Sequence, residues 1–243
     1  MLSTNARKMT SHTNRAAARD RRARMSPARR ARRCLPLALA LALALALVSG
    51  CGGGGMVSAT TLYPRLLPAS AVPGFGLERK LDWSNPVDLV GEGVALPQIT
   101  HPSAGVEEFQ SAHLKGAVGE VLNRGAGFNV TAIHLGAAKF DSASDAVKVR
   151  NWMHGEDLQQ PCFSICAFSP MPTKVPGVPD SAAVIQTTTG GRRGFGPANY
   201  RAEFTIGPYL YWAWFQGNSS PQTKSTFEKG LGRYYQHAKQ QKS

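Results

Sequence analysis

The stretch Tyr200-Arg-Ala-Glu-Phe-Thr-Ile-Gly-Pro-Tyr-Leu-Tyr-Trp-Ala-Trp-Phe215 decides the fold. From Tyr200 to Ile206, apolar side chains alternate with polar ones, which predicts a strand with one solvent-exposed face. That polar face would carry Arg201, Glu203 and Thr205. Gly207-Pro208 predicts a turn, and Tyr209–Phe215 predicts a second strand that is apolar on both faces. We therefore expect two neighbouring antiparallel strands.

The aromatic side chains of the second strand have two interpretations. In the first they are core, with one face of the strand under the helices and the other under an N-terminal arm. In the second, an apolar groove binds a lipid-like or aromatic ligand, and its lining comes from Tyr209, Tyr211, Trp212 and Trp214. Because two indoles are the largest apolar area available, we expect Trp212 and Trp214 on the packed face and Tyr209 and Tyr211 on the groove face.

The other elements follow from turn residues and apolar spacing. Strands are predicted at about 109–118 and 128–140, on either side of a glycine loop, and again at 182–188. Helices are predicted after Asn85-Pro86, from Ser142 to Gly155 and from Ser225 onward. Five prolines make the segment 160–180 a predicted irregular region.

These elements predict an α+β fold with an antiparallel sheet of about five strands and helices packed mainly on one face. We expect residues 1–50 to form an Arg-rich leader and signal peptide. Residues 51–80 would hold a lipidated cysteine, a glycine tether and a Pro-rich arm, and residues 81–243 a single α+β domain.

Cys51 follows Val48-Ser49-Gly50 at the end of a 14-residue apolar run, Leu35–Val48, behind an Arg-rich segment. This run is too short to span a membrane, which takes about 20 residues, and is typical of a signal peptide. We expect Cys51 to be acylated and to anchor the chain on the extracytoplasmic face of the cell membrane. The glycines Gly52–Gly55 favour this over an ordinary secretory signal with an incidental cysteine, since they would form a flexible tether.

The net charge of +13 is concentrated in the leader. Eleven Lys or Arg and one acid precede Cys51, whereas 17 bases and 14 acids follow it. After the leader no basic stripe with interleaved aromatic residues is visible, so the composition argues against nucleic-acid binding.

Cys162 and Cys166 are the two cysteines that remain after the signal and the lipidation site. In an oxidising compartment such a pair usually forms a disulfide, which we expect here. Two alternatives stay open: a metal site that includes His154, for which the sequence offers no evident fourth ligand, and a redox pair, for which the C-x-x-C spacing is missing.

Several short motifs together resemble a known class of protein. They are the Cys51 signal, the glycine tether, the Leu-Leu-Pro-x-Ser-x-Val-Pro-Gly-Phe pattern at 66–75, Phe140-Asp141-Ser142 before a helix, Val175-Pro-Gly-Val-Pro179 and a closing helix. The chain resembles actinobacterial envelope lipoproteins of unassigned function, whose domains are similar to PsbP-like and other sensor-type α+β sandwiches. The resemblance implies a non-enzymatic envelope protein.

The sequence holds no recognisable catalytic motif, and it predicts no cofactor and no metal site. The loop Gly190–Gly196 carries Arg192, Arg193 and Phe195, a possible contact for anionic lipid or a partner. We expect a non-catalytic domain that binds an apolar ligand or an envelope protein. The alternative is an envelope hydrolase acting on cell-wall or lipid substrates, which histidines and acids gathered in one pocket would favour.

Overall fold

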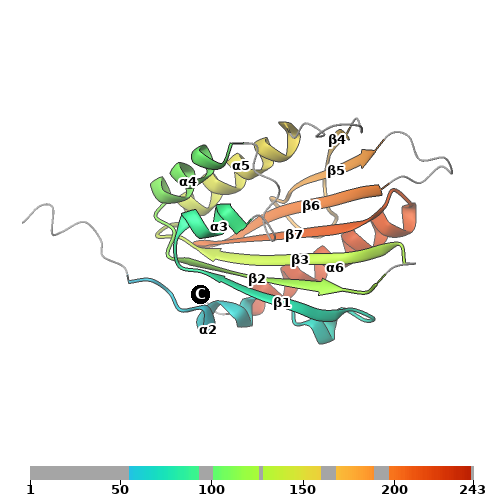
Figure 1. Ribbon diagram of the computed structural model, residues 1–243, viewed down its shortest axis with the longest axis horizontal. Coiled ribbons are helices and arrows are strands. Elements are labelled where there is room, and N and C mark those ends of the chain that lie inside the picture. The colour runs from blue at the N-terminus through green and yellow to red at the C-terminus, as the bar shows by residue number, and fades with distance from the viewer. Residues whose placement is uncertain (1–54, 93–100, 126–127, 160–167, 189–196, 242–243) are drawn as a thin grey trace, which may run out of the picture. The chain divides into compact units, whose positions relative to one another are not determined.

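The computed structural model describes residues 55–92, 101–125, 128–159, 168–188 and 197–241. Gly54–Ser243 is one compact unit. Its described part confirms the α+β class and holds a seven-stranded antiparallel sheet in the order β1-β2-β3-β7-β6-β5-β4 (Figure 1). The strands are β1 (Gly76–Trp83), β2 (Gly116–Asn123), β3 (Val130–Lys139), β4 (Phe168–Thr173), β5 (Ala182–Thr188), β6 (Pro197–Ile206) and β7 (Tyr209–Asn218).

Helices and short turns cover both faces of this sheet. The helices are α2 (Ala59–Leu62), α3 (Pro86–Glu92), α4 (Pro102–Ser111), α5 (Ala143–Gln159) and α6 (Pro221–Gln240), with 3₁₀ turns η2 (Tyr63–Arg65) and η3 (Ala69–Ala71). None of these described helices is both long and apolar enough to cross a membrane.

The β6–β7 hairpin forms as predicted and lies near the middle of the sheet. Gly207 takes a φ of +55°, a conformation that suits glycine, and places Ile206 opposite Tyr209. Strand β7 pairs with β3 on one side and with β6 on the other. It is therefore enclosed by strands, and its alternate side chains enter two separate cores.

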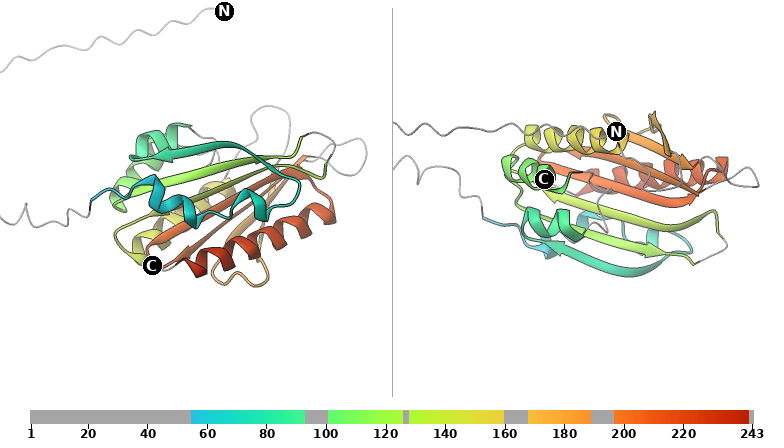
Figure 2. Two further views of the ribbon diagram at one scale, coloured as in Figure 1. Left: turned by 90° about the horizontal axis from the view of Figure 1, so that it is seen from below. Right: turned by 45° about the horizontal axis from the view of Figure 1, so that its top comes forward.

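The expectation that helices pack mainly on one face was wrong. One core lies under α6 and the arm, which we define as residues 57–75, and it includes Tyr209, Tyr211 and Phe227. The other lies under α3, α4 and α5 and includes Trp212 and Met153. Figure 2 shows the arm and α6 together on one side of the sheet and the green and yellow helices on the other. The architecture is thus three-layered.

Two strands lie where the sequence predicted none, and they account for the sheet having seven strands rather than five. Strand β1 extends the arm along the edge of β2, with a register shift between Leu77 and Arg79. Strand β4 forms the opposite edge within the proline-rich segment and pairs only with β5. Pro170 and Pro172 fit there because an edge strand leaves one side of its backbone unpaired.

Several predicted boundaries also move. Phe109, expected to open a strand, lies in α4, and β2 begins only at Gly116. Helix α5 runs past Gly155 to Gln159, and α6 begins at Pro221 rather than Ser225. Its cap is Ser220, whose hydroxyl accepts a hydrogen bond from the Thr223 backbone N–H at 3.2 Å.

Gly136 on β3 is fixed by close packing. Trp212 lies across it, so that an added Cβ would overlap the indole ring. Trp212 itself is 1% exposed and belongs to the core under α5. The largest side chain of β7 therefore requires a residue without a side chain on the neighbouring strand.

Candidate functional site

The arm is held on the sheet by a buried arginine. Arg65 is 6% exposed, its Cζ lies 3.5 Å from the centre of the Tyr209 ring, and Nη1 donates to the Tyr211 hydroxyl at 3.2 Å. Burial raises the pKa of Tyr211, against the opposing effect of Arg65. The face expected to line a groove is thus filled by the arm, as the core interpretation of β7 required.

The burial of the four aromatic residues differs from the expected pattern. Tyr209 is 5% exposed and Tyr211 is fully buried, so neither contacts solvent as a ligand site would. Trp212 is buried as expected, whereas Trp214 is only half-buried and stacks on His134 with ring centres 4.5 Å apart. Because both tyrosines are buried, the prediction that they line a ligand groove was wrong.

A pocket of ≈ 500 Å³ lies between the arm, the β1–β2 edge and the end of α6. We call it the arm pocket. Three arm side chains, Pro64, Leu66 and Pro68, give it an apolar wall. Its other lining residues are Thr60, Tyr63, Lys80, Glu120 and His237. The volume and the mixture of apolar wall and a few polar groups are those of a small-molecule site.

Each titratable group of the arm pocket has a protein partner. The Lys80 ammonium lies 3.6 Å from Glu120 and 4.8 Å from the centre of the Tyr63 ring. The Tyr63 hydroxyl donates to the Leu81 carbonyl at 3.0 Å, and His237 Nε2 lies 2.9 Å from the Pro64 carbonyl oxygen. These contacts hold the polar groups in place around the opening.

Glu120 is the most enclosed of these groups, with only 6% of its surface exposed. Burial raises the pKa of its carboxyl, and the neighbouring Lys80 opposes that rise. Burial also raises the pKa of Tyr63, helped by the charges of Asp82 and Glu120. The pocket therefore combines a desolvated acid with an exposed ammonium at its rim.

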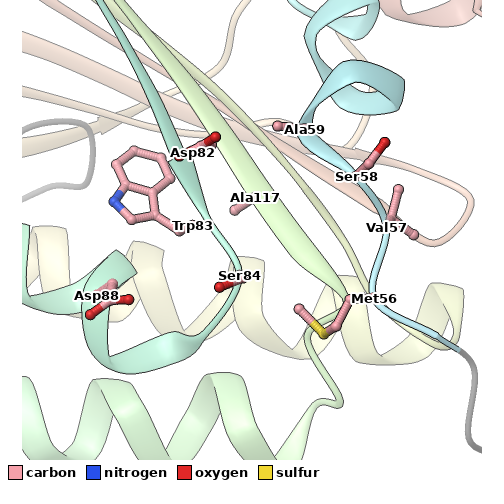
Figure 3. Close-up of a pocket in the computed structure, with 9 residues that line it drawn as sticks. All are labelled: Met56, Val57, Ser58, Ala59, Asp82, Trp83, Ser84, Asp88 and Ala117. Atoms are coloured by element: carbon pink, nitrogen blue, oxygen red, sulfur yellow. The ribbon is translucent and has the colours of Figure 1, made fainter.

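A second pocket of ≈ 540 Å³ opens at the start of the arm (Figure 3). Figure 3 shows Asp82, Trp83 and Asp88 on one side and Met56 with the arm residues Val57 and Ser58 on the other. The remaining lining residues are Ala59, Ser84 and Ala117. Asp82 and Asp88 are exposed, and Asp88 accepts a hydrogen bond from the Asn85 amide at 2.5 Å. This pocket is acidic, but both of its carboxylates are exposed, whereas the arm pocket holds the buried Glu120.

On the opposite face of the sheet, two charged side chains of β6 are buried, although the alternation of the sequence predicted them to be exposed to solvent. Arg201 is 3% exposed and Glu203 is 1% exposed, because the C-terminal part of α5 covers them. Arg201 Nη1 donates to Asp157 Oδ1 at 2.8 Å, and Asp157 is fully buried. The expectation of a solvent-exposed face on β6 was therefore wrong for these two residues.

Asp157 and Glu203 interact directly within this buried cluster. Burial and the Asp157 charge raise the pKa of Glu203 well above its ordinary range. Burial also raises the pKa of Asp157, which Arg201 lowers. Burial lowers the pKa of His154, one turn earlier on α5. Removal of two carboxyls from water thus favours a protonated Glu203 beside an Asp157–Arg201 ion pair.

Six of the predicted functional residues lie outside the described residues. They are Cys51, Cys162, Cys166, Arg192, Arg193 and Phe195. The acylation, the disulfide and the loop contact therefore stay predictions. Within the part of the chain that the structure describes, no group of three His, Cys, Asp or Glu residues is arranged to hold a metal ion.

Comparison with known proteins adds one finding about the fold. No protein-family model and no curated protein matches the sequence. Among solved structures, the extracellular domain of PknH from Mycobacterium tuberculosis is similar, with a TM-score of 0.52 and 13% identity. The match covers 77% of this chain and all of that domain. At this identity the likeness establishes the fold alone.

Proposed function

We propose that this protein is a cell-envelope lipoprotein, anchored through acylated Cys51, whose domain binds a ligand without catalysing a reaction. The signal-like sequence before Cys51 supports the anchor. The shared fold with an extracellular domain of a mycobacterial protein supports a location outside the cytoplasm. The arm pocket is the observation that carries the binding function, since it combines an enclosed carboxyl with an apolar wall.

The arm pocket would suit a small amphipathic molecule. Its apolar part would pack on Pro64, Leu66 and Pro68, and its polar end would reach Lys80 and Glu120. The polar groups favour binding over catalysis because each is already engaged by a protein partner. A ligand would add its own contacts to these groups at the rim of the pocket, and its binding would require no proton transfer.

The two neighbouring threonines of α2 give a matched test of this site. Thr60 lines the arm pocket and Thr61 does not, although both are exposed and both lie within hydrogen-bonding distance of the Ser58 hydroxyl. Thr60→Trp should fill the pocket and abolish co-purification of a small molecule detected by native mass spectrometry. Thr61→Trp should retain it. Equal retention by both variants would show that the ligand site lies elsewhere.

The anchor has its own test. Cells grown with an alkyne-bearing fatty-acid analogue should label the wild-type chain, and Cys51→Ala should abolish the label because the thiol is the acylation site. The Cys162→Ala variant is the matched cysteine control and should keep the label. Label that persists on the Cys51→Ala chain would contradict acylation at this position.

One observation favours the hydrolase alternative. The arm pocket brings His237 and the buried Glu120 into one lining, which is the gathering of histidine and acid that such an enzyme needs. If the pocket hydrolysed an ester or amide, both Glu120→Gln and His237→Gln would lower turnover at least tenfold with the fold intact. Hydrolysis of fluorogenic esters and peptidoglycan fragments that neither substitution changes would exclude this role.

A further inference from the structure

Helix α6 separates an apolar face from a basic one. Its buried side chains, Phe227, Leu231, Tyr234 and Ala238, pack into the core beneath the arm. Its exposed side includes Lys229, Arg233, Gln236, Lys239 and Gln240. Across the whole helix four Lys or Arg accompany a single acid, Glu228. The solvent face of α6 is therefore positively charged.

A third pocket, of ≈ 520 Å³, lies between this basic face and the arm. Two arm residues, Leu67 and Ala71, line it opposite α6. From α6 come Lys229, Gly232, Arg233, Gln236, His237 and Gln240. Among the described residues, neither Lys229 nor Arg233 forms an ion pair with an acid. Since the two are four residues apart, they lie one turn apart over one hollow.

The helices on the other face of the sheet have the opposite charge. Helices α3 and α4 carry four acids and no Lys or Arg. Helix α5 carries three acids and two bases, but two of its acids, Glu156 and Asp157, are buried. The sheet thus separates the acidic helices α3 and α4 from the basic helix α6, and an anionic surface would repel the first and attract the second.

The expected anchor is joined to the domain through the arm. Val57, in the arm, donates from its backbone N–H to the Lys115 carbonyl at 2.8 Å, so the chain is attached to the domain from this residue onward. Val57 lies six positions after Cys51, and a fully extended chain of six residues spans about 20 Å. An acyl group on Cys51 would therefore hold the start of the arm near the bilayer surface, and α6 contacts the same arm further along, at Leu67 and Ala71.

We infer that the basic face of α6, with Lys229 and Arg233 at its centre, docks on the anionic phospholipid surface to which the chain is anchored. This docking rests on the proposed function, because the acylated Cys51 is what would bring the domain to a membrane. Docking would orient the domain with α3, α4 and α5 away from the bilayer. The arm pocket shares His237 with the third pocket, so it would then open close to the lipid headgroups.

Vesicle binding of the unacylated fragment Gly54–Ser243, which is one compact unit, tests the docking surface. It should sediment with vesicles of phosphatidylcholine and phosphatidylglycerol, but not with phosphatidylcholine alone, and salt should weaken the binding. Each basic residue near an anionic surface strengthens binding about fivefold. Lys229→Gln with Arg233→Gln should therefore lower the partition coefficient roughly 25-fold.

The matched control removes the same charge elsewhere. Arg79 and Lys174 are exposed and lie outside α6 and the arm, so Arg79→Gln with Lys174→Gln should change the partition coefficient less than about fivefold. An equal loss in both double variants, or equal binding to both kinds of vesicle, would overturn the docking surface. Saturable binding of glycerol 3-phosphate without vesicle binding would also overturn it. Because the fragment lacks Cys51, failure here is distinguishable from failure of the anchor, which fatty-acid labelling decides.

Discussion

Removal of Arg201 should destabilise the protein strongly and in a pH-dependent manner. In Arg201→Leu, the fully buried Asp157 loses the guanidinium that donates to its Oδ1 at 2.8 Å. Breaking a buried ion pair by removing one partner costs about 3–5 kcal/mol, because the remaining charge stays desolvated. We expect the free energy of unfolding near neutral pH to fall by about that amount.

The loss should shrink as the pH falls. Burial already raises the pKa of Asp157, and Arg201 is the largest influence that lowers it. Without Arg201 the folded-state pKa rises further above the unfolded one, so the folded chain holds a proton that the unfolded chain releases. Such a group destabilises the fold above its unfolded pKa, and the penalty disappears below it. The variant should therefore approach wild type towards about pH 4.

Urea unfolding followed by tryptophan fluorescence at several pH values measures this effect. Arg201→Leu combined with Asp157→Asn should recover about 2 kcal/mol or more near neutral pH, since no unpaired charge remains. Arg233→Leu is the control. Arg233 is exposed and, in the described part of the chain, forms no ion pair, so its removal should change stability by less than about 0.5 kcal/mol. A pH-independent loss in Arg201→Leu, unchanged by Asp157→Asn, would refute the buried ion pair as its cause.

Three further predictions concern the buried Glu203, the packing at Gly136 and the cysteine pair. Wild-type stability should decline as the pH rises above the ordinary carboxyl value of 4.5, because Glu203 is favoured in its protonated form, and Glu203→Gln should flatten that decline in pH-dependent urea titrations. Gly136→Ala should lower the free energy of unfolding by about 1–3 kcal/mol, whereas Gly155→Ala, in open space within α5, should raise it by roughly 0.5–1 kcal/mol. Cys162 and Cys166 should resist alkylation under denaturing, non-reducing conditions, and two reactive thiols would exclude their disulfide.

Local patterns were sufficient to predict the centre of the fold. The alternation from Tyr200 onward and the turn at Gly207 predicted β6 and β7, and the Ser142 cap predicted the start of α5. These features depend on residues next to one another in sequence. The edge strands do not. Strands β1 and β4 gain their ladder hydrogen bonds by pairing with β2 and β5, and the prolines of β4 mask its tendency to pair.

The buried cluster and the arm pocket escaped prediction for a related reason. Arg201 and Glu203 have the alternation of a solvent-exposed face, and only the docking of α5, which supplies Asp157, makes that face interior. Likewise, Lys80 and His237 are far apart in sequence and meet at one pocket because the arm folds back over the sheet. The core interpretation of Tyr209–Phe215 predicted an arm over one face of β7, but it did not predict which side chains would meet there.

The two edges of the sheet bear on how the protein would behave at high surface density. Lipid-anchored molecules share a plane, where encounters between neighbours are frequent, and an unprotected edge strand would recruit the edge of the next copy into a continuous ribbon. Pro170 and Pro172 deprive β4 of two amide donors, and the offset between Leu77 and Arg79 interrupts the ladder that β1 could offer. If Cys51 is acylated as proposed, crowded copies should therefore remain individual particles that diffuse independently rather than polymerise.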